Sequence, residues 1–211
     1  MAADLLFYTN PMSRGQIARW MLEEVGQPYE QVVLSYGGEM KSPEYLAINP
    51  MGKVPAIVHA GQVVTECAAI CAYLADAFPE AGLLPDPEHR GAYFRWLLFA
   101  AGPLEAAIID RALHVQVPPE MERSAGYGTY ERTIDTLEQA VTGKDYIAGN
   151  RFSAADVYVG AHIDWGLTMG TIPSRPAFEA YVAKLRTRPA YRRQKEIDHA
   201  LIEASQQQPH G

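Results

Sequence analysis

Hydrophobic and polar positions in the first 80 residues alternate between strand-like and helix-like patterns. The apolar run at 5–8 ends at Asn10-Pro11, which predicts a buried strand followed by a turn. Behind Ser13, apolar residues recur at helical spacing until Gly26, so Ser13 is a candidate N-cap. The same reasoning predicts a strand at 29–34, a short helix opening at Ser42-Pro43, a hairpin of strands at 56–58 and 63–64 around Gly61-Gln62, and a helix at 66–78.

The order strand, helix, strand, helix, strand, strand, helix is that of a thioredoxin-like α/β domain. Proline and glycine residues interrupt the chain from Pro79 to Pro87, and long amphipathic helical patterns then replace the strand patterns. We therefore predict a thioredoxin-like domain at 1–80, a linker at 81–87 and an all-α helical domain at 88–211. Its helices are predicted at 88–116, 120–142, 154–169, 175–187 and 189–206.

Composition and charge narrow the functional classes. Of the 211 residues, 48% are hydrophobic and 20% are charged, which is the balance of a folded protein. The net charge of -7, with acidic and basic residues mixed, argues against nucleic acid as a partner. The N-terminus lacks the basic segment of a secretion signal, and the longest apolar run, 96–104, is interrupted by Gly102 and Pro103. We expect a cytoplasmic protein without a membrane partner.

The only two cysteines, Cys67 and Cys71, lie four residues apart on the helix predicted at 66–78. This spacing puts both on one helical face and suits reduced, buried thiols better than a disulfide framework. We also predict no metal site.

Val54-Pro55 stands directly before the apolar strand at 56–58. Because proline cannot donate a hydrogen bond to a strand ladder, it must lie at the beginning of that strand. Our hypothesis is a cis bond, which would turn the backbone groups of Val54 outward to pair with an extended peptide. An ordinary trans proline at a strand start is the alternative.

A helix is predicted to open at Thr65-Glu66-Cys67. The unpaired N–H groups and positive dipole end of a helix start can bind a carboxylate. Glu66 in the first turn equally suits simple stabilisation of the helix dipole, which is the alternative role.

Further motifs are spread along nearly the whole chain. They are Tyr8, Ser13-Arg14, Asn49-Pro50-Met51-Gly52-Lys53-Val54-Pro55, Glu66-Cys67 with Ala69-Ile70 and Tyr73-Leu74, and Gly149-Asn150 leading to Phe152-Ser153 and Ala155-Asp156. Together they resemble the cytosolic glutathione S-transferase superfamily, and in particular bacterial members with a serine-type site. Ser153 and Asp156 match the capping box of its helical domain, a folding element.

The resemblance implies that glutathione is the co-substrate and assigns its contacts. The backbone of Val54 beside Pro55 pairs with the cysteinyl part, and Glu66 with Cys67 holds the γ-glutamyl carboxylate. Relatives usually have Ser at the position of Cys67, and a thiol is a weaker donor, so the backbone N–H of Cys67 is the firmer expectation. Lys41 and Lys53 match contacts to the glycine carboxylate, although two solvated surface lysines are the alternative.

Two residues compete for the role of stabilising the glutathione thiolate. Ser13 matches the hydroxyl of serine-type transferases and Tyr8 that of tyrosine-type classes, whose members generally have Gly at the position of Ser13. We favour Ser13, with Arg14 as a nearby positive charge. The alternative is that Ser13 only caps a helix and that Tyr8 is a core aromatic.

The function implied by the resemblance is attack of the glutathione thiolate on a small, apolar electrophile, a detoxification reaction. Glutathione-dependent disulfide reduction, dehalogenation or isomerisation, and a non-catalytic binding protein, are the alternatives. Relatives assemble as homodimers, which we expect here. The pocket for the electrophile is expected between Ser13 and the first helices of the helical domain, with Met12, Trp96, Phe99 and Tyr127 as candidates, although each is also a plausible core residue.

Overall fold

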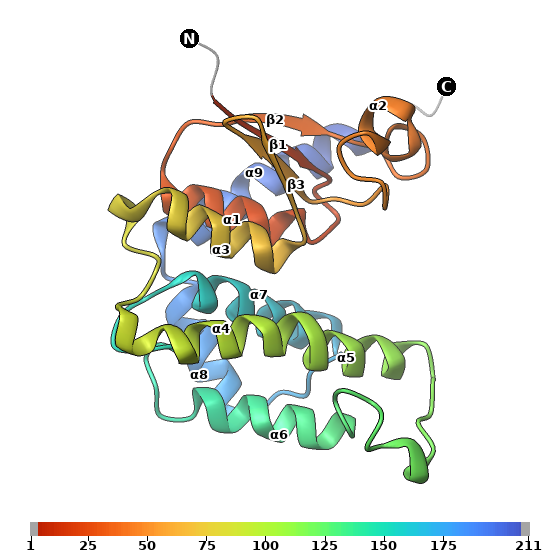
Figure 1. Ribbon diagram of the computed structural model, residues 1–211, viewed down its shortest axis with the longest axis vertical. Coiled ribbons are helices and arrows are strands. Elements are labelled where there is room, and N and C mark those ends of the chain that lie inside the picture. Colours follow the sequence, from red (N-terminus) through yellow and green to blue (C-terminus); the bar gives the residue numbers. More distant parts are fainter. Residues whose placement is uncertain (1–3, 208–211) are drawn as a thin grey trace. The chain divides into compact units, whose positions relative to one another are not determined.

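The computed structural model describes residues 4–207 (Figure 1). Residues 1–3, which belong to the segment inspected for a secretion signal, lie outside the described part. By its internal contacts the chain forms two compact units: the residues up to Gly82 with those from Thr187 onward, and Leu83–Arg186. This differs from the predicted division at 81–87 in one element, because the C-terminal helix belongs by contacts to the first unit.

A four-stranded sheet forms the centre of the first unit, with the order β2-β1-β3-β4. Strands β1 and β2 are parallel, whereas β1–β3 and β3–β4 are antiparallel, and the β3–β4 pair is the predicted hairpin. Along β1, Leu5, Phe7 and Thr9 on one face are buried, while Leu6 and Tyr8 on the other face are half-buried. The strands are β1 Leu5–Thr9, β2 Glu30–Val33, β3 Ala56–His59 and β4 Gln62–Thr65.

The turn of the hairpin differs from the prediction by one residue. His59 pairs with Gln62, so the two turn residues are Ala60 and Gly61 rather than Gly61-Gln62. Both have positive φ angles, 49° and 76°, as the tightest hairpin turns require. Alanine rarely adopts this conformation, which is why the pattern pointed one residue too far along the chain.

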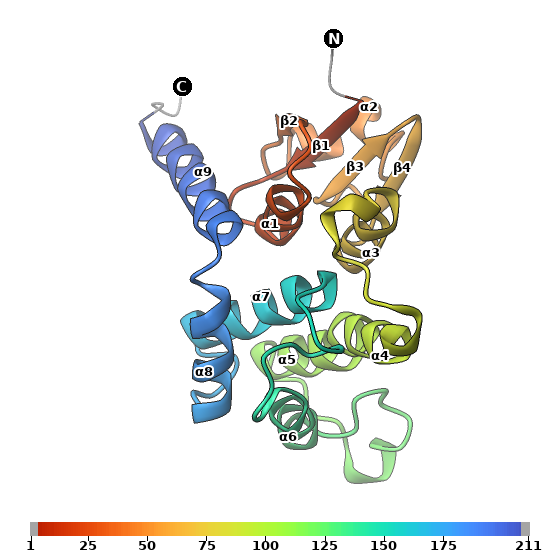
Figure 2. The same cartoon turned by 90° about the vertical axis from the view of Figure 1, so that its left-hand side faces the viewer.

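Helices α1 and α3 lie on the same side of the sheet (Figure 2). On β1, Phe7 faces this side, where its ring lies 5.2 Å from the Arg19 guanidinium of α1. Tyr8 points the opposite way and packs on Tyr45 of α2, because successive strand residues face opposite sides. The helices of this unit are α1 Gly15–Val25, α2 Pro43–Leu46, α3 Cys67–Ala77 and α9 Pro189–Gln206, with 3₁₀ turns at Glu39–Lys41 and Pro79–Ala81.

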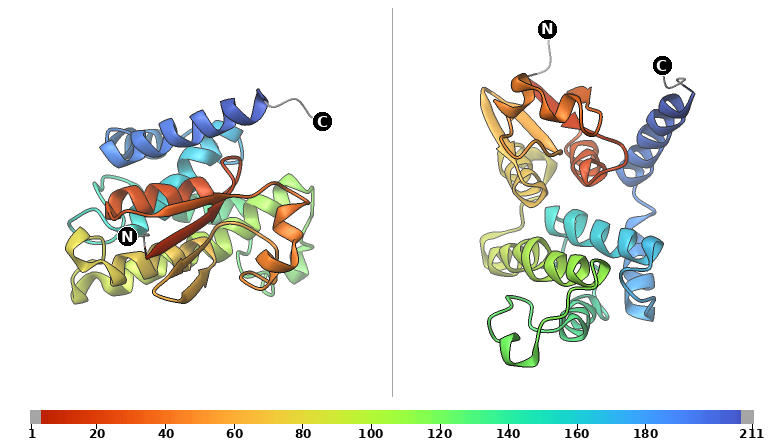
Figure 3. Two further views of the ribbon diagram at one scale, coloured as in Figure 1. Left: turned by 90° about the horizontal axis from the view of Figure 1, so that it is seen from above. Right: turned by 90° about the vertical axis from the view of Figure 1, so that its right-hand side faces the viewer.

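The C-terminal helix α9 runs alongside α1 (Figure 3). Arg19 Nε lies 2.9 Å from Asp198 Oδ1, and both side chains are almost fully buried. The rings of Trp20 and Tyr191 pack edge to face with their centres 5.1 Å apart. These contacts are the physical reason why α9 belongs with the first unit, and amphipathic periodicity alone could not reveal its partner.

The second unit is helical. Its elements are α4 Arg90–Phe99, a π-helical segment Ala100–Leu104, α5 Glu105–Ala112, α6 Tyr130–Val141, α7 Ala154–Met169 and α8 Pro176–Leu185, with 3₁₀ turns at Pro87–His89 and Pro119–Met121. The limits predicted for α7 are confirmed. The helices predicted at 88–116 and 120–142 are shorter in the structure.

Both shortened helices have local causes. The first continues past Pro103 through the π-helical segment and ends at Ala112, because His114 has a φ of 57°, which a continuous helix excludes. Helix α6 begins only at Tyr130, where the Thr129 side chain caps it by accepting from the N–H of Arg132 at 3.2 Å. Just before this cap, Gly128 has a φ of 68°, which a continuous helix excludes.

The predicted capping box at the start of α7 is confirmed. Asp156 accepts from the N–H of Ser153 at 2.9 Å, from the N–H of Ile147 at 2.8 Å and from Tyr181 Oη at 2.6 Å. Burial raises the pKa of Asp156 above its ordinary value. The hydrogen bonds oppose this shift. Since the Ser153 hydroxyl also donates to Asp156 Oδ2 at 2.9 Å, the carboxylate binds four groups in the core of the helical unit.

One described stretch, Pro87–Ala112, is long and apolar enough to cross a membrane by length and composition alone. A core helix of a water-soluble protein passes the same test.

Candidate active site

The Ser13 hydroxyl lies at the start of α1 and bonds to backbone groups on two sides. Ser13 Oγ donates to the carbonyl of Asn10 at 2.7 Å and accepts from the N–H of Gly15 at 2.9 Å. The N-cap position is Arg14, so the predicted N-cap was one residue early, although Ser13 does bind the first N–H of the helix. Only 9% of Ser13 is exposed, so its hydroxyl is held in a defined place.

The loop that carries Ser13 is tied down by neighbours on several sides. The carbonyl of Thr9 accepts from the N–H of Leu34 at 2.8 Å, and the Asn10 side chain donates to the carbonyl of Leu34 at 2.8 Å. The carbonyl of Pro11 accepts from Gln16 Nε2 at 2.6 Å. The backbone around Ser13 is therefore held by hydrogen bonds from backbone amides and from the side chains of Asn10 and Gln16.

The start of α3 meets the start of α1 at Cys67. Its Sγ lies 3.7 Å from the carbonyl of Arg14. Cys67 and Cys71 are both buried free thiols, as the sequence predicted. A hydrogen bond with Cys67, and then burial, raise the pKa of the Cys71 thiol. Cys71 is therefore a protonated core residue, while Cys67 stands where two helix starts converge.

Glu66 precedes α3 with a backbone conformation that is unusual for its type. Its φ of 64° lies in the left-handed region, which costs a non-glycine residue about 1–3 kcal/mol. The side chain is exposed and makes no capping hydrogen bond to any described residue. Glu66 is the N-cap residue of α3 rather than a first-turn residue, and its role in stabilising the helix dipole stays an alternative. Because its side chain does not cap the helix, it leaves the first-turn amides of α3 available to an external acceptor.

The Val54-Pro55 bond is cis, which confirms the hypothesis. Just before it, the carbonyl of Lys53 accepts from Tyr45 Oη at 2.6 Å and from Asn49 Nδ2 at 2.8 Å. Burial raises the pKa of Tyr45 to about 12, so this phenol remains a donor at neutral pH. The side chains of Tyr45 and Asn49 thus fix the backbone that leads into β3, while the side chain of Lys53 is exposed.

Lys41 binds the turn at Met51-Gly52, which precedes the cis bond. Its Nζ donates to the carbonyls of Met51 at 3.1 Å and Gly52 at 3.0 Å. A Cβ on Gly52 would lie 2.6 Å from Lys41 Nζ and 2.7 Å from the carbonyl of Met40, so only glycine fits there. Lys41 is an exposed residue whose ammonium group binds backbone carbonyls of the neighbouring turn, and its contact with the glycine carboxylate stays a prediction.

The structure separates the two candidates for the thiolate donor. Tyr8 lies on the α2 side of the sheet, with its ring centre 5.3 Å from that of Tyr45. It also packs against the buried cluster of Leu34, Met40, Tyr45 and Ala56. Ser13 belongs to the start of α1, on the other side. Tyr8 is half-buried, so it packs on the edge of the core rather than within it.

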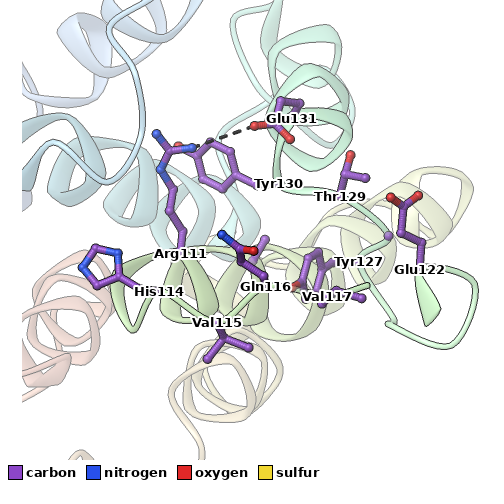
Figure 4. Close-up of a pocket in the computed structure, with 12 residues that line it drawn as sticks. Arg111, His114, Val115, Gln116, Val117, Glu122, Tyr127, Thr129, Tyr130 and Glu131 are labelled. Atoms are coloured by element: carbon purple, nitrogen blue, oxygen red, sulfur yellow. Dashed lines mark ion pairs between the residues drawn. The ribbon is translucent and has the colours of Figure 1, made fainter. Parts of the chain in front are cut away.

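The helical unit contains a cavity of about 490 Å³ at the end of α5 (Figure 4). The candidate Tyr127 lines it, and its Oη donates to Asp110 at 2.8 Å. Two residues that the sequence did not single out also meet here: the guanidinium carbon of Arg111 lies 4.2 Å from the ring centre of Tyr130. They meet only because the loop at 113–129 folds back, and no periodic pattern signals that. The other aromatic candidates, Trp96 and Phe99, pack on each other with ring centres 5.4 Å apart.

A second cavity of about 450 Å³ lies along α1 and α9 in the first unit. Sequence reasoning missed it because it had placed α9 in the helical domain. Its lining residues are Gln16, Lys195, Glu196, Asp198, His199 and Ile202.

Comparison with known proteins bears on both units. Residues 12–77 match the family model described as glutathione S-transferase, N-terminal domain, and residues 108–189 match that of the C-terminal domain. A glutathione S-transferase A of Pleuronectes platessa is 30% identical over 184 residues, which are 81% of each chain. The chain belongs to the glutathione S-transferase family. Another glutathione S-transferase, from Xanthomonas campestris pv. campestris, is 28% identical over 84% of this chain and 91% of its own.

Solved structures of the family share the whole architecture. A theta class glutathione S-transferase from Xanthomonas axonopodis pv. citri, solved with glutathione bound, has a TM-score of 0.72 and 27% identity, and the match covers 91% of this chain and 97% of that one. A sphingomonad glutathione S-transferase complexed with glutathione has a TM-score of 0.73 and 26% identity, over 92% and 98%. The mixed sheet with its helices and the helical unit are therefore the fold of glutathione S-transferases.

Proposed function

We propose that this chain is a glutathione transferase in which the Ser13 hydroxyl stabilises the thiolate of bound glutathione. The observation that carries the proposal is the bonding of Ser13 Oγ, which accepts from the N–H of Gly15 at 2.9 Å and donates to the carbonyl of Asn10 at 2.7 Å. A hydroxyl hydrogen can rotate about the Cβ–Oγ bond without moving the oxygen. Ser13 can therefore redirect its hydrogen from Asn10 to a thiolate while Gly15 keeps the oxygen in place.

The reaction needs little movement from the protein. The glutathione thiol releases its proton to solvent, and the thiolate sulfur attacks an electrophilic carbon, forming a C–S bond as the leaving group departs or as a double bond accepts the electron pair. A hydrogen bond that is stronger to the thiolate than to the thiol lowers the thiol pKa. The N–H of Gly15 strengthens Ser13 as a donor, because chained hydrogen bonds polarise one another.

Other residues of the first unit bind glutathione in this proposal. Val54 pairs its backbone with the cysteinyl part, and the first-turn amides at Cys67 hold the γ-glutamyl carboxylate beside Glu66. Lys41 and Lys53 face the glycine carboxylate. The observation in favour of this arrangement is that Glu66 keeps a left-handed backbone without using its side chain as a cap.

The test is a titration of the bound thiol. Free thiols titrate near about 8.5, and a value of about 6–7 is expected for glutathione on the wild type. Ser13→Ala should raise it by one unit or more, each unit being roughly 1.4 kcal/mol, and should lower kcat more than it weakens binding. Thiolate absorbance against pH measures this. If Tyr8→Phe raises the pKa instead while Ser13→Ala does nothing, the assignment of Ser13 is wrong.

The type of reaction is tested with separate substrate classes. We propose conjugation of a small apolar electrophile, for which the exposed Met12 beside Ser13 offers an apolar contact. A panel should include an aryl halide, an α,β-unsaturated ketone, a mixed disulfide and an isomerisable substrate. Turnover of the disulfide alone would favour a reductase, and glutathione binding without any turnover would favour a non-catalytic role.

We further propose a cytoplasmic homodimer that uses one face of the helical unit. Along α4 and α5 and at the residue after α5, large apolar side chains are exposed in the single chain: Phe94 by 49%, Leu98 by 66%, Ile109 by 39% and Leu113 by 67%. Such a row is typical of a surface that another chain covers. Sedimentation should give a dimer for the wild type and a monomer for Leu98→Glu; a monomeric wild type at micromolar concentration would refute the dimer.

A further inference from the structure

Tyr36 is an exposed residue whose hydroxyl is nevertheless bound to the loop before α1. It is 62% exposed, and its Oη donates to the carbonyl of Met12 at 3.1 Å. A solvent-facing phenol has water as a ready partner, so a hydrogen bond to a backbone carbonyl 24 residues away calls for an explanation. Met12 is the residue immediately before Ser13.

With the bond from Tyr36, both polar groups of the Met12–Ser13 peptide are hydrogen-bonded. The Met12–Ser13 peptide has its carbonyl held by Tyr36, and its N–H donates to the carbonyl of Asn10 at 3.1 Å. This planar group carries the Cα of Ser13, so its orientation sets where the Ser13 side chain starts. Tyr36 therefore controls the hydroxyl of Ser13 through the backbone, without touching it.

The segment that carries Tyr36 is itself fixed to the same loop. Leu34 exchanges hydrogen bonds with the end of β1, donating to Thr9 and accepting from Asn10, each at 2.8 Å. The N–H of Ser35 donates to Glu39 Oε2 at 2.7 Å. The Tyr36 hydroxyl thus reaches Met12 from a segment held on both sides.

The contribution of Tyr36 should grow when glutathione binds. The carbonyl of Asn10 accepts both the N–H and the hydroxyl of Ser13, the latter at 2.7 Å. When the hydroxyl turns to a thiolate, Ser13 loses that second link. The Met12–Ser13 peptide is then held by the Asn10 bond and by Tyr36, so the reactive state depends on Tyr36 more than the resting state does.

We propose that Tyr36 is a positioning residue for the thiolate-stabilising hydroxyl of Ser13. This inference rests on the proposed function, because it assigns to Tyr36 a role in the reaction that Ser13 performs. It needs no contact between Tyr36 and either substrate.

The test compares Tyr36→Phe with Tyr130→Phe. Tyr130 Oη donates to the carbonyl of Thr171 at 2.7 Å in the other compact unit, so both changes delete one bond from a phenol to a backbone carbonyl. Since a hydrogen bond contributes about 0.5–1.5 kcal/mol, Tyr36→Phe should lower kcat/KM at neutral pH by about two- to tenfold. It should raise the pKa of the bound thiol and leave the Kd of glutathione nearly unchanged. Tyr130→Phe should leave the thiol pKa at the wild-type value.

A double-mutant cycle shows whether Tyr36 acts through Ser13. In the Ser13→Ala background, Tyr36→Phe should have no further effect on the thiol pKa, because the group it positions is gone. An unchanged thiol pKa in the single variant, or an equal effect in both backgrounds, overturns the inference. A loss as large as that of Ser13→Ala also overturns it, by making Tyr36 the donor itself. A wild type that does not lower the thiol pKa refutes the proposed function, and this inference with it.

Discussion

The loop before α1 and the cavity at the end of α5 are built in opposite ways. Around Ser13, each hydrogen bond described above has a backbone carbonyl or amide as at least one partner, and the residue is 9% exposed. The α5 cavity is lined by partly or fully exposed side chains such as Arg111, His114 and Glu122, apart from Ala107 at its base. A backbone-built site holds one geometry, whereas a side-chain-built cavity can change its lining by single substitutions. A reaction step that needs the same geometry in every turnover, such as stabilisation of a thiolate, is therefore expected at Ser13.

The ion pairs of the two regions differ in the same way. Arg19 and Asp198 are 1% and 2% exposed, and they join α1 to α9. Arg111 and Glu131 are 58% and 75% exposed and lie 3.9 Å apart (Figure 4). Burial raises the pKa of Asp198 despite the attraction of Arg19, so desolvation outweighs the pairing. The buried pair is therefore costly to keep and more costly to break, while the exposed pair is neither.

The largest expected effect is on stability at the buried pair. Asp198→Ala should lower the free energy of unfolding by about 3–5 kcal/mol, because Arg19 would remain buried without its partner. The matched variant Glu131→Ala should change it by no more than about 0.5 kcal/mol. Urea denaturation measures both. Similar losses in the two variants would contradict the contrast between a fixed and an adaptable region.

A smaller effect is expected from adding one methyl group beside Ser13. In Gly15→Ala the new Cβ would lie 2.1 Å from Thr9 Oγ1, 3.0 Å from Ser13 Oγ and 3.1 Å from the carbonyl of Asn10. Overpacking of this kind costs about 1–3 kcal/mol, and here it should also displace Ser13 and reduce kcat.

The control for this change is Gly126→Ala in the loop beside the α5 cavity. No described atom lies within 4 Å of a Cβ there, and the φ of Gly126 is not in the left-handed region. Its stability should stay within about 0.5 kcal/mol of the wild type. A Gly15→Ala enzyme with wild-type stability and turnover would show that the Ser13 loop adjusts to an added methyl group and is not fixed in one geometry.

The same contrast explains what the sequence could predict. The element order of the first unit, the cis Val54-Pro55 bond and the Ser153–Asp156 capping box are confirmed, because each depends on local residue types at fixed spacing. The two buried thiols followed from helical spacing in the same way.

Contacts between residues far apart along the chain could not be predicted from the sequence. The attachment of α9 to α1 rests on Arg19 and Asp198, which are 179 residues apart. The tie from Tyr36 to Met12 and the stacking of Arg111 on Tyr130 likewise join separate elements. Nothing in the periodicity of either partner marks these pairs, because periodicity reports which face is buried and not what buries it.

The smallest expected effect concerns Tyr127, the one candidate for the electrophile pocket that lines the α5 cavity. Its Oη is already bound to Asp110 at 2.8 Å, and burial, followed by that hydrogen bond, raises its pKa. Because this phenol is engaged within the protein, Tyr127→Phe should change the KM for an apolar electrophile by less than about twofold, a change below roughly 0.4 kcal/mol. Steady-state kinetics at saturating glutathione measures this, with Met12→Ala run in parallel as the change beside Ser13. A larger shift in KM for Tyr127→Phe than for Met12→Ala would mean that the adaptable cavity, and not the surface next to Ser13, selects the electrophile.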